Sequence, residues 1–313
     1  MAREPLGDDG LSGATLERVW LPDGRTVVVK RQSPRSDLFM RVLGDEHGRE
    51  LDLYQRGVLD LLPPSIRHSV IGGWVAGDTT VIVMRDLGDR VLGWRDKLSP
   101  PRARDLVRRL AEMHTHFAGA PPEGLAPLPP LVATFAPSRL EPFVAMGHPI
   151  VAAALDGWGL FASLVPGDVA DAVEALLDKP DPLVTALSEC TPTLCHGDLA
   201  TVNLAWEDDG GLTLIDWGQA VAAPGEFDIT RLLAGCAPGL GLAREAFLDE
   251  YRRAAPGSSA RAMRLSFLAG LLWLGWNKAL DASRHPSEAK RAREREDLAW
   301  WVEKGREALD AGL

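Results

Sequence analysis

The sequence predicts an α+β protein of two lobes, a small strand-rich N-terminal lobe and a larger, mainly helical C-terminal lobe. Three observations support this prediction. Strand-like runs dominate residues 1–86, helical periodicity dominates residues 87–313, and three short strand-like runs in the second part carry charged residues. We therefore take 1–86 and 87–313 as the two lobes and expect a ligand-binding cleft where they meet.

The composition is that of an ordinary globular protein. The chain has 313 residues, of which 46% are hydrophobic and 25% are charged, so it is long enough to bury a substantial core. The net charge of −10 lacks the basic balance of a nucleic-acid-binding protein, and we expect no nucleic-acid partner. The three cysteines form no CxxC pair, which argues against both a disulfide framework and a zinc cluster.

No segment has the pattern of a membrane span or of a secretion signal. The longest apolar run, near Leu265–Trp276, is shorter than the roughly 18 residues that a span needs, so it predicts a buried helix. The start of the chain is polar and acidic and lacks the apolar stretch of a signal peptide. We therefore expect a cytoplasmic protein without a membrane partner.

Two β-hairpins with a helix between them are expected in the N-terminal lobe. Turn-forming residues at 22–24 and 76–78 separate runs that are rich in β-branched side chains. The predicted strands are Glu17–Leu21, Arg25–Arg31, Val70–Val75 and Thr79–Met84, and the predicted helix lies near Asp45–Gly57.

In the C-terminal lobe, a helix is predicted to begin at Pro100, because proline is favoured at the first helical position and apolar residues follow at helical spacing. The proline-rich stretch Gly119–Pro142 predicts a long irregular connection. Three short strands are then expected, and the pattern is helical from Glu226 onward. The three predicted strands are Thr193–His196, Asn203–Trp206 and Leu212–Ile215.

The strongest chemical signal is a pair of short motifs. Residues 195–203 have the sequence CHGDLATVN, and residues 214–218 have the sequence LIDWG. Phosphoryl transfer needs a carboxylate that orients the acceptor hydroxyl and accepts its proton, and oxygen ligands that hold Mg²⁺ beside nucleotide phosphates. The spacing therefore indicates Asp198 as the base, with Asn203 and Asp216 as metal ligands. Any one of them alone is explained as a turn or capping residue, but their joint spacing favours the chemical hypothesis.

At these motifs the sequence resembles the aminoglycoside phosphotransferase and choline kinase-like family of small-molecule kinases. The resemblance extends over residues 11–228, although it is specific only at the HGD motif with its following Asn and at the IDW motif. It implies a bilobal protein-kinase-like fold, ATP or GTP as co-substrate with Mg²⁺, and phosphorylation of a hydroxyl on a small molecule. Protein kinases have H-R-D and D-F-G at these places, where this chain has Gly197 and Trp217.

A kinase also needs a lysine on an early strand that binds the phosphates and pairs with a glutamate on the next helix. Lys30 ends the run VVVK, and Glu50 lies on the predicted helix. The family layout implies that these two pair, with Glu46, one turn earlier, as the alternative. The competing interpretation is a solvated charge at a strand end and an exposed helix face.

Two further parts of a nucleotide site are implied by the resemblance. The loop Gly10–Thr15 lacks the GxGxxG pattern, but its small residues, Ser12 and Gly13 among them, allow backbone N–H groups to approach phosphates. Taken alone, this loop is better explained as a surface turn. The run 81–87 lies where the family binds the base, so Met84 would pack on it and the backbone of Arg85 and Leu87 would offer hydrogen bonds.

Several other polar residues near the motifs are expected to be structural. His196 is expected to order the loop that carries Asp198, and Asp228 matches a family position that braces the loops. His114 is expected to be a packed helix residue, and Cys195 a buried strand residue.

The chemical identity of the acceptor is the feature that the sequence predicts least well. Trp273 and Trp276 lie on one predicted helix face, and such residues either pack the core or line an acceptor site for a quaternary ammonium or an apolar ring. Most of the net negative charge lies in 87–313, which favours a small hydroxylated, cationic acceptor. The expected acceptor is an aminoglycoside-like or other antibiotic or amino sugar, with choline or another amino alcohol as the alternative. A nucleotide-binding protein without transfer activity and a protein kinase are the competing hypotheses.

Overall fold

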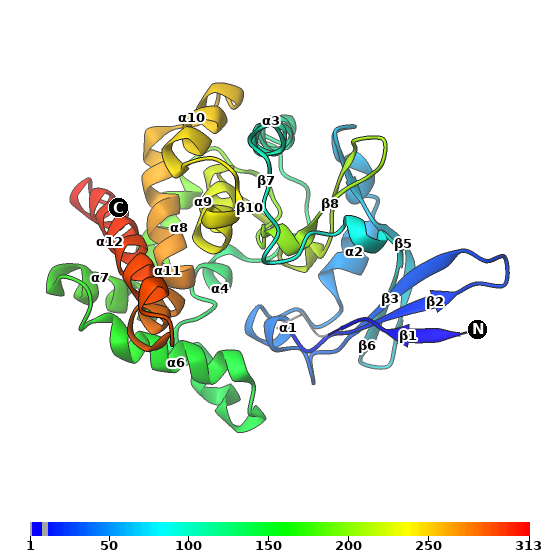
Figure 1. Cartoon of the computed structure of the whole chain (residues 1–313), viewed down its shortest axis with the longest axis horizontal. Helices are drawn as coiled ribbons and strands as arrows, with labels where there is room; N and C mark the ends of the chain where they lie inside the picture. Colours follow the sequence, from blue (N-terminus) through cyan, green and yellow to red (C-terminus); the bar gives the residue numbers. More distant parts are fainter. Residues whose placement is uncertain (1, 8–11) are drawn as a thin grey trace.

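The computed structural model describes residues 2–7 and 12–313, which fold into two lobes joined by a short connection (Figure 1). The smaller lobe is built on an antiparallel sheet with the strand order β1-β2-β3-β6-β5. The strands are β1 (Arg3–Pro5), β2 (Thr15–Trp20), β3 (Thr26–Gln32), β5 (Val70–Ala76) and β6 (Thr79–Arg85). Both predicted hairpins are present, with ends that differ by one or two residues from the expected ones.

Two short helices follow β3 where a single one was predicted near 45–57. They are α1 (Leu38–Val42) and α2 (Arg49–Gln55). The second begins later than predicted because the carboxylate of Asp45 accepts hydrogen bonds from the backbone N–H groups of Gly48 and Arg49, at 2.9 and 2.8 Å. This side chain satisfies donors that have no partner inside the helix and so fixes its first turn.

A three-stranded sheet connects the two lobes and was not predicted as such. It contains β4 (Ile66–His68), β8 (Leu204–Trp206) and β9 (Leu212–Leu214) in the order β4-β9-β8. β4 runs parallel to β9 although it comes from the first part of the chain, whereas β8 and β9, two of the predicted strands, pair antiparallel. The first of the three predicted strands, β7 (Thr193–Cys195), pairs instead with β10 (Val221–Ala223).

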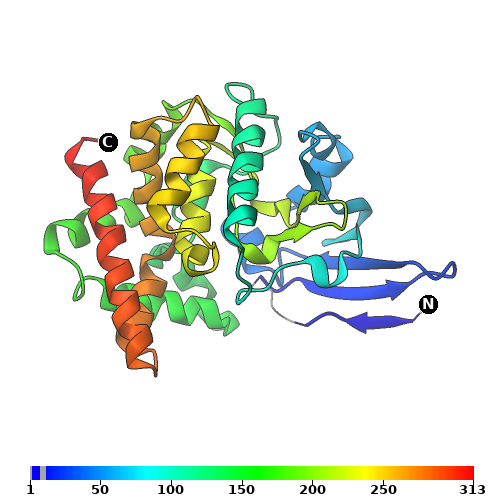
Figure 2. The same cartoon turned by 45° about the horizontal axis from the view of Figure 1, so that its top comes forward.

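The larger lobe is mainly helical, as expected. Ser99 caps its first long helix, and two prolines occupy the first turn of that helix. The longest helix, α11, is buried between α6, α9 and α12, and it contains the apolar run 265–276 (Figures 1 and 2). The main helices are α3 (Pro100–His116), α6 (Pro149–Phe161), α7 (Gly167–Asp178), α8 (Asp181–Ser188), α9 (Glu226–Cys236), α10 (Arg244–Ala254), α11 (Ala260–Arg284) and α12 (Glu288–Asp310).

The proline-rich connection is more ordered than predicted. It contains α4 (Leu128–Val132) and α5 (Pro137–Leu140), followed by the 3₁₀ helix η3 (Glu141–Met146). Each of the three has a proline in its first turn, where the missing N–H costs nothing and the fixed φ favours a helix. The prolines therefore start short helices here and do not exclude them.

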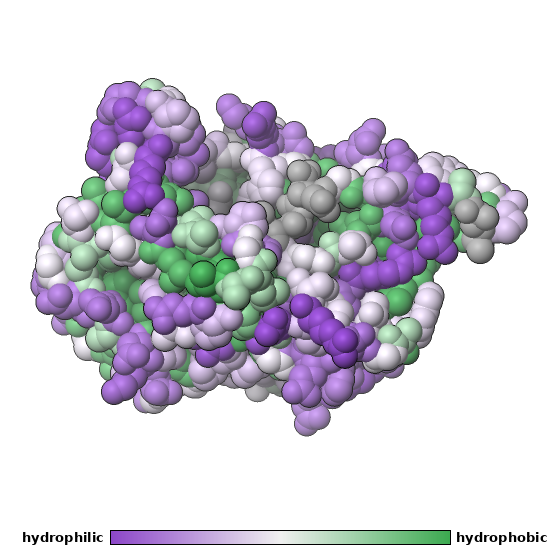
Figure 3. All heavy atoms as spheres, turned by 90° about the horizontal axis from the view of Figure 1, so that it is seen from below, coloured by the Kyte–Doolittle hydropathy of each residue, from purple (hydrophilic) through white to green (hydrophobic). Residues whose placement is uncertain are grey.

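The surface of the molecule is mixed. The face in Figure 3 is largely hydrophilic, with separate hydrophobic areas among the charged residues. Scattered exposed apolar side chains of this kind are normal for globular proteins. Within the described ranges, no helix has both the length and the apolar character needed to cross a membrane.

Candidate active site

The centre of the site is an ion-pair triad of Lys30, Glu50 and Asp216. Lys30 Nζ lies 3.0 Å from Glu50 Oε2 and 2.7 Å from Asp216 Oδ1. Burial opposes the charge on Lys30, but the two carboxylates more than compensate and raise its pKa. Glu46 is exposed and makes no contact with Lys30, so Glu50 is the partner.

Asp216 is held in an unusual backbone conformation. Its φ of +65° makes it the one non-glycine residue with positive φ in the described part of the chain. Such strain persists where surrounding contacts fix it, and it is common at functional sites. Burial acts to raise the pKa of Asp216, but the charge and hydrogen bond of Lys30 outweigh it and hold that pKa below its ordinary value. Asp216 is therefore an anion fixed at the end of β9.

Glu50 also ties the small lobe to the LIDWG motif. Its Oε1 accepts a hydrogen bond of 3.3 Å from the backbone N–H of Trp217, while its Oε2 contacts Lys30. Trp217 is fully buried, packs against His196 with tilted rings whose centroids are 4.7 Å apart, and donates its Nε1–H to Leu214 O. A tryptophan at this position thus packs the motif against the loop that carries Asp198.

Asp228 on α9 holds the backbone of the HGD loop in place. The two carboxylate oxygens of Asp228 accept the backbone N–H groups of His196 and Gly197, at 2.7 and 2.9 Å. Gly197 has a φ of +80°, and a Cβ there would lie 2.0 Å from Gln219 O, so only glycine fits. Burial acts to raise the pKa of Asp228, but its hydrogen bond with His114 and nearby charge lower it. Asp228 and His114 therefore have the structural role expected for them.

His196 links the two motifs directly. Its Nε2 lies 2.9 Å from Ile215 O, and its Nδ1 accepts the backbone N–H of Asp198 at 3.3 Å. An Nε2–H tautomer satisfies both hydrogen bonds. His196 thus orders the loop, as expected, and Cys195 beside it is buried.

The side chain of Asn203 contacts the backbone of Asp198 within the HGD loop. The Asn203 side-chain amide donates to the backbone carbonyl of Asp198 at 2.8 Å, so its oxygen, Oδ1, is not used by this contact. Burial, followed by the negative charge of Asp216, raises the pKa of Asp198 above its ordinary value. A raised pKa brings the basicity of a carboxylate closer to neutral pH, which is the range that suits a general base.

Two cavities flank the triad. We call the first the hinge cavity; it has a volume of 310 Å³ and lies between the β-sheet and the connection to the large lobe. It is lined by Met84, Arg85 and Leu87, the residues for which the resemblance implies contact with the base. The N–H of Arg85 already donates to Ser69 O at 2.8 Å, so a backbone hydrogen bond from Arg85 to a base has to use its carbonyl.

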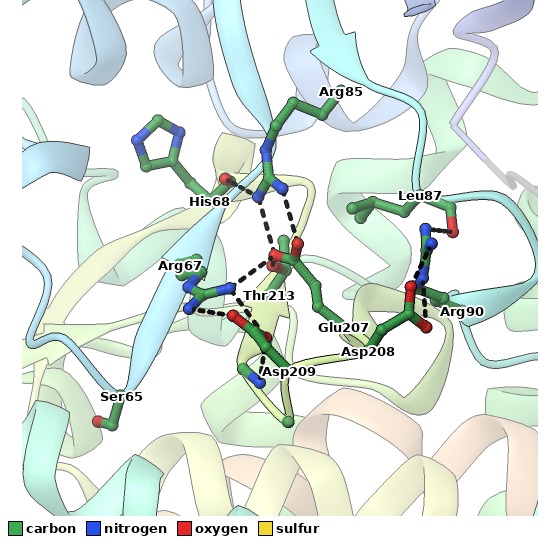
Figure 4. A network of polar contacts seen from close by, with 12 residues as sticks. Ser65, Arg67, His68, Arg85, Leu87, Arg90, Glu207, Asp208, Asp209 and Thr213 are labelled. Atoms are coloured by element: carbon green, nitrogen blue, oxygen red, sulfur yellow. Dashed lines mark hydrogen bonds and ion pairs between the residues drawn. The ribbon is translucent and has the colours of Figure 1, made fainter. Parts of the chain in front are cut away.

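The side chain of Arg85 points away from this segment and anchors it. Its guanidinium donates two hydrogen bonds to Glu207, at 2.8 and 3.0 Å, in the turn between β8 and β9 (Figure 4). In the same turn, Asp209 accepts a hydrogen bond from Arg67, and Asp208 accepts one from Arg90. The hinge and the hairpin that leads to Asp216 are therefore joined by several ion pairs.

The loop predicted to cover phosphates lies beside both cavities. Ser12 lines each of them, whereas Gly10 and Leu11 of the same loop lie outside the described residues. Gly13 has a φ of +99°, and a Cβ on it would lie 2.2 Å from Ser36 O. Glycine is therefore needed for the loop to pass over the start of α1.

The second cavity, which we call the aromatic cavity, has a volume of 380 Å³. Asp198 lines it and does not line the hinge cavity. Its walls include aromatic residues from four separate segments, namely Phe39, Trp94, Phe135, Trp273 and Trp276. Trp273 and Trp276 are 8% and 5% exposed, so they pack in a hydrophobic cluster and line the cavity at the same time.

The two cavities meet at the motif residues. Lys30, Asn203 and Asp216 line both of them, so one ligand in each cavity would be in contact at these side chains. Sequence reasoning missed Arg231, which also lines the aromatic cavity. A signal was available, because Arg231 is three positions after Asp228 and therefore lies on the same face of a helix.

Comparison with known proteins decides the family. The sequence profile described as the phosphotransferase enzyme family matches residues 9–263, which is more than half of the chain. The chain belongs to the phosphotransferase enzyme family. This phosphotransferase is therefore an enzyme, a small-molecule kinase. A search of the curated proteins gives no match.

Solved structures with the same fold include the GDP and kanamycin complex of APH(2")-IIia. It has a TM-score of 0.54 and 16% identity over 100% of this chain and 94% of that chain. Choline kinase LicA from Streptococcus pneumoniae has a TM-score of 0.53 and 14% identity, covering 97% of this chain and 93% of that chain. Spectinomycin phosphotransferase in complex with ADP and spectinomycin has a TM-score of 0.52 and 13% identity, covering 97% and 92%. The expected two-lobed α+β kinase-like fold is confirmed.

Proposed function

We propose that this phosphotransferase transfers the γ-phosphoryl group of ATP or GTP to a hydroxyl of a small molecule. One observation carries the proposal. The hinge cavity and the aromatic cavity meet at Lys30, Asn203 and Asp216, and Asp198 faces only the aromatic side. A nucleotide in the first cavity and an acceptor in the second would thus meet beside a carboxylate base, in the order that in-line transfer requires.

Within this proposal, Asp198 holds the acceptor hydroxyl and accepts its proton. Its raised pKa brings its basicity closer to the working pH, which suits a general base. Lys30 binds the nucleotide phosphates and neutralises charge as the bond to the leaving oxygen breaks. Glu50 is a positioning residue, because it is fully buried and orients Lys30 from behind.

The side chains present also fit a magnesium ion. Asp216 offers one carboxylate oxygen besides the one that contacts Lys30, and Asn203 offers its Oδ1 because its amide nitrogen is engaged by Asp198 O. Carboxylate and amide oxygens are ligands that Mg²⁺ accepts together with phosphate oxygens. When bound, the metal ion would supply positive charge to the phosphate oxygens. Asn203 and Asp216 would hold it.

The base of the nucleotide is assigned to the hinge cavity, with Met84 against the ring and backbone groups of Arg85 and Leu87 within reach. Ser12 and Gly13 are assigned to the loop over the phosphates. We place the reaction in the cytoplasm, where nucleoside triphosphates are available. For the acceptor, the neighbouring structures with kanamycin, spectinomycin and the choline kinase name support a small hydroxylated compound, an antibiotic, amino sugar or amino alcohol.

A screen for phosphoryl transfer tests the proposal. The purified protein is incubated with ATP or GTP, Mg²⁺ and panels of antibiotics, amino sugars and amino alcohols, and each acceptor is examined for the mass gain of one phosphoryl group. We expect a product that needs nucleotide, Mg²⁺ and an intact Asp198. Nucleotide binding without any transfer across the panels would contradict the proposed acceptors, and transfer to generic proteins would indicate a protein kinase.

A further inference from the structure

A buried arginine forms part of the wall of the aromatic cavity. Arg231 on α9 is 4% exposed, and its guanidinium carbon lies 3.4 Å from the ring centroid of Trp273 and 4.8 Å from that of Phe227. Its Nη2 donates to Leu131 O at 3.0 Å. Its Nη1 has no hydrogen-bond partner among the residues that the structure describes. The guanidinium thus lies against both rings, and its Nη1 donor is unused.

An unused donor on a buried cation is costly, because the group has lost its hydration without gaining a partner. Asp198 and Asp228 are close enough to favour the charge of Arg231, but neither accepts a hydrogen bond from it. Burial lowers the pKa of Arg231 to about 9, which leaves the group positively charged at neutral pH. An oxygen atom of a bound acceptor is a partner that would satisfy this donor.

The rest of the wall is apolar and aromatic. The ring of Phe135 lies between those of Trp273 and Trp276, with centroids 4.8 and 5.2 Å away. Trp94, which lines the same cavity, is 51% exposed, so its indole is available to a ligand. Such surfaces bind flat, apolar groups, and a few polar groups then determine the orientation of the ligand.

The part of this wall at Trp273 is poorly suited to a cationic group of the acceptor. The face of Trp273 that could hold an ammonium is occupied by the guanidinium of Arg231, and a second cation beside it would be repelled. Two other acids that line the cavity already accept backbone hydrogen bonds. Asp37 accepts the N–H of Met40 at 2.9 Å, and Asp45 accepts those at the start of α2.

We propose that Arg231 determines acceptor specificity, binding a carbonyl or carboxylate oxygen of an acceptor whose flat apolar part lies against Phe135 and Trp276. This inference rests on the proposed function, because it assumes that the acceptor occupies the aromatic cavity. It departs from the cationic acceptor that the charge of the whole C-terminal lobe favours. That charge includes surface acids already paired with arginines, such as Glu288 with Arg291 and Arg295.

Binding of three matched probes tests the inference. They are para-(hydroxymethyl)benzoate, the corresponding benzamide, and para-(hydroxymethyl)benzylamine, which share a ring and a hydroxyl and differ only in the opposite group. Affinities are measured by calorimetry with nucleoside diphosphate and Mg²⁺ present. We expect the benzoate and the benzamide to bind about tenfold or more tightly than the amine. Comparison of the first two distinguishes an anionic from a neutral oxygen.

Variants test whether Arg231 causes the preference for the benzoate and the benzamide over the amine. Arg231→Met should remove the preference, Arg231→Lys should keep part of it, and Trp94→Ala at an exposed site should weaken all three probes similarly. Nucleotide affinity reports correct folding, because Arg231 does not line the hinge cavity. The inference is overturned if the amine binds as well as the other two, if no probe binds, or if Arg231→Met leaves the preference unchanged.

The experiment also separates the inference from the proposed function. Each probe is examined for phosphoryl gain alongside the binding measurement. Arg231-dependent binding without phosphoryl gain from any probe or panel acceptor would contradict the proposed phosphoryl transfer, while showing that Arg231 selects the ligand of this cavity. Efficient phosphorylation of kanamycin or choline with equal kcat/KM in the wild type and Arg231→Met would support the function and overturn the inference.

Discussion

Lys30 Nζ and Asp216 Oδ1 lie 2.7 Å apart, although the two residues are 186 positions apart in the chain. Lys30 comes from a strand of the small lobe and Asp216 from the end of a strand in the large lobe. Their contact closes the site between the lobes and leaves the second oxygen of Asp216 for another ligand. The pair therefore joins the group assigned to phosphate with the group assigned to the metal.

Replacement of Asp216 by Asn should separate its charge from its backbone role. Asparagine tolerates the left-handed conformation, so Asp216→Asn keeps the backbone while removing the anion. We expect Mg²⁺-dependent nucleotide affinity to fall at least about tenfold, because even indirect metal partners have effects of that size. Titration of nucleotide with and without Mg²⁺ measures this, and an unchanged metal dependence would remove Asp216 as a ligand.

Loss of Lys30 should impair catalysis, and it also leaves the buried carboxylate of Glu50 without its cation, so folding is checked by thermal unfolding. In Lys30→Met the phosphates lose a buried cation, and we expect kcat/KM to fall about a hundredfold or more. Lys97→Met, at an exposed position, is the matched control and should retain wild-type kinetics. Wild-type kinetics in Lys30→Met would mean that another cation serves the phosphates.

Replacement of the proposed base should affect turnover and leave the nucleotide in place. Asp198→Asn removes the proton acceptor from the aromatic cavity, and we expect kcat to fall about 10²- to 10⁴-fold. Nucleotide affinity should change little, since Asp198 does not line the hinge cavity. Steady-state kinetics and calorimetry measure the two effects, and retained turnover would exclude Asp198 as the base.

The dependence of kcat/KM on pH should reflect the ionisation of Asp198. A base works when deprotonated, so kcat/KM should fall as the pH is lowered through the pKa of Asp198. Burial and Asp216 raise that pKa, which places the acidic limb above the ordinary range of an aspartate. A profile of kcat/KM against pH checks this, and a limb at or below the ordinary aspartate value would contradict the raised pKa.

Glu207 should make the free energy of unfolding depend on pH in the acidic range. Hydrogen bonds from Arg85 lower the pKa of Glu207 from 4.5 to about 2, so its stabilisation is complete above the unfolded value and is lost as the pH falls toward 2. Glu207→Gln should lower the free energy of unfolding at neutral pH by about 1 kcal/mol, because solvent screens this partly exposed ion pair, and the difference should shrink in acid. Denaturant unfolding at several pH values measures both. Glu123→Gln, at an exposed site, is the control, and an equal loss there would refute the assignment.

The sequence predicted the parts of the site that lie close together in the chain. Asp198, Asn203 and Asp216 belong to one short segment, so their spacing was enough to indicate phosphoryl transfer. Lys30 followed from the position of a lysine at a strand end. The family resemblance favoured Glu50 with Glu46 as the alternative, and the structure shows that Glu50 is the residue that contacts Lys30.

The acceptor side could not be predicted in the same way. Arg231 and Trp94 are separated by more than a hundred residues, and they share a cavity only because α9 packs beside the segment that follows the hinge. The pairing of β4 with β9 likewise joins distant, three-residue strands with no local pattern to mark them. Such features depend on tertiary packing rather than on periodicity.

The parallel pairing of β4 with β9 has a consequence for how the chain can be divided. Ile66 and His68 of the first part are in register with Leu212 and Leu214 of the second. A polypeptide cut after residue 86 would therefore leave an unpaired strand edge on each fragment. The cut would also separate Arg67 and Arg85 from their counter-ions, Asp209 and Glu207. We expect the severed pieces to recombine into one working molecule rather than to fold as independent units.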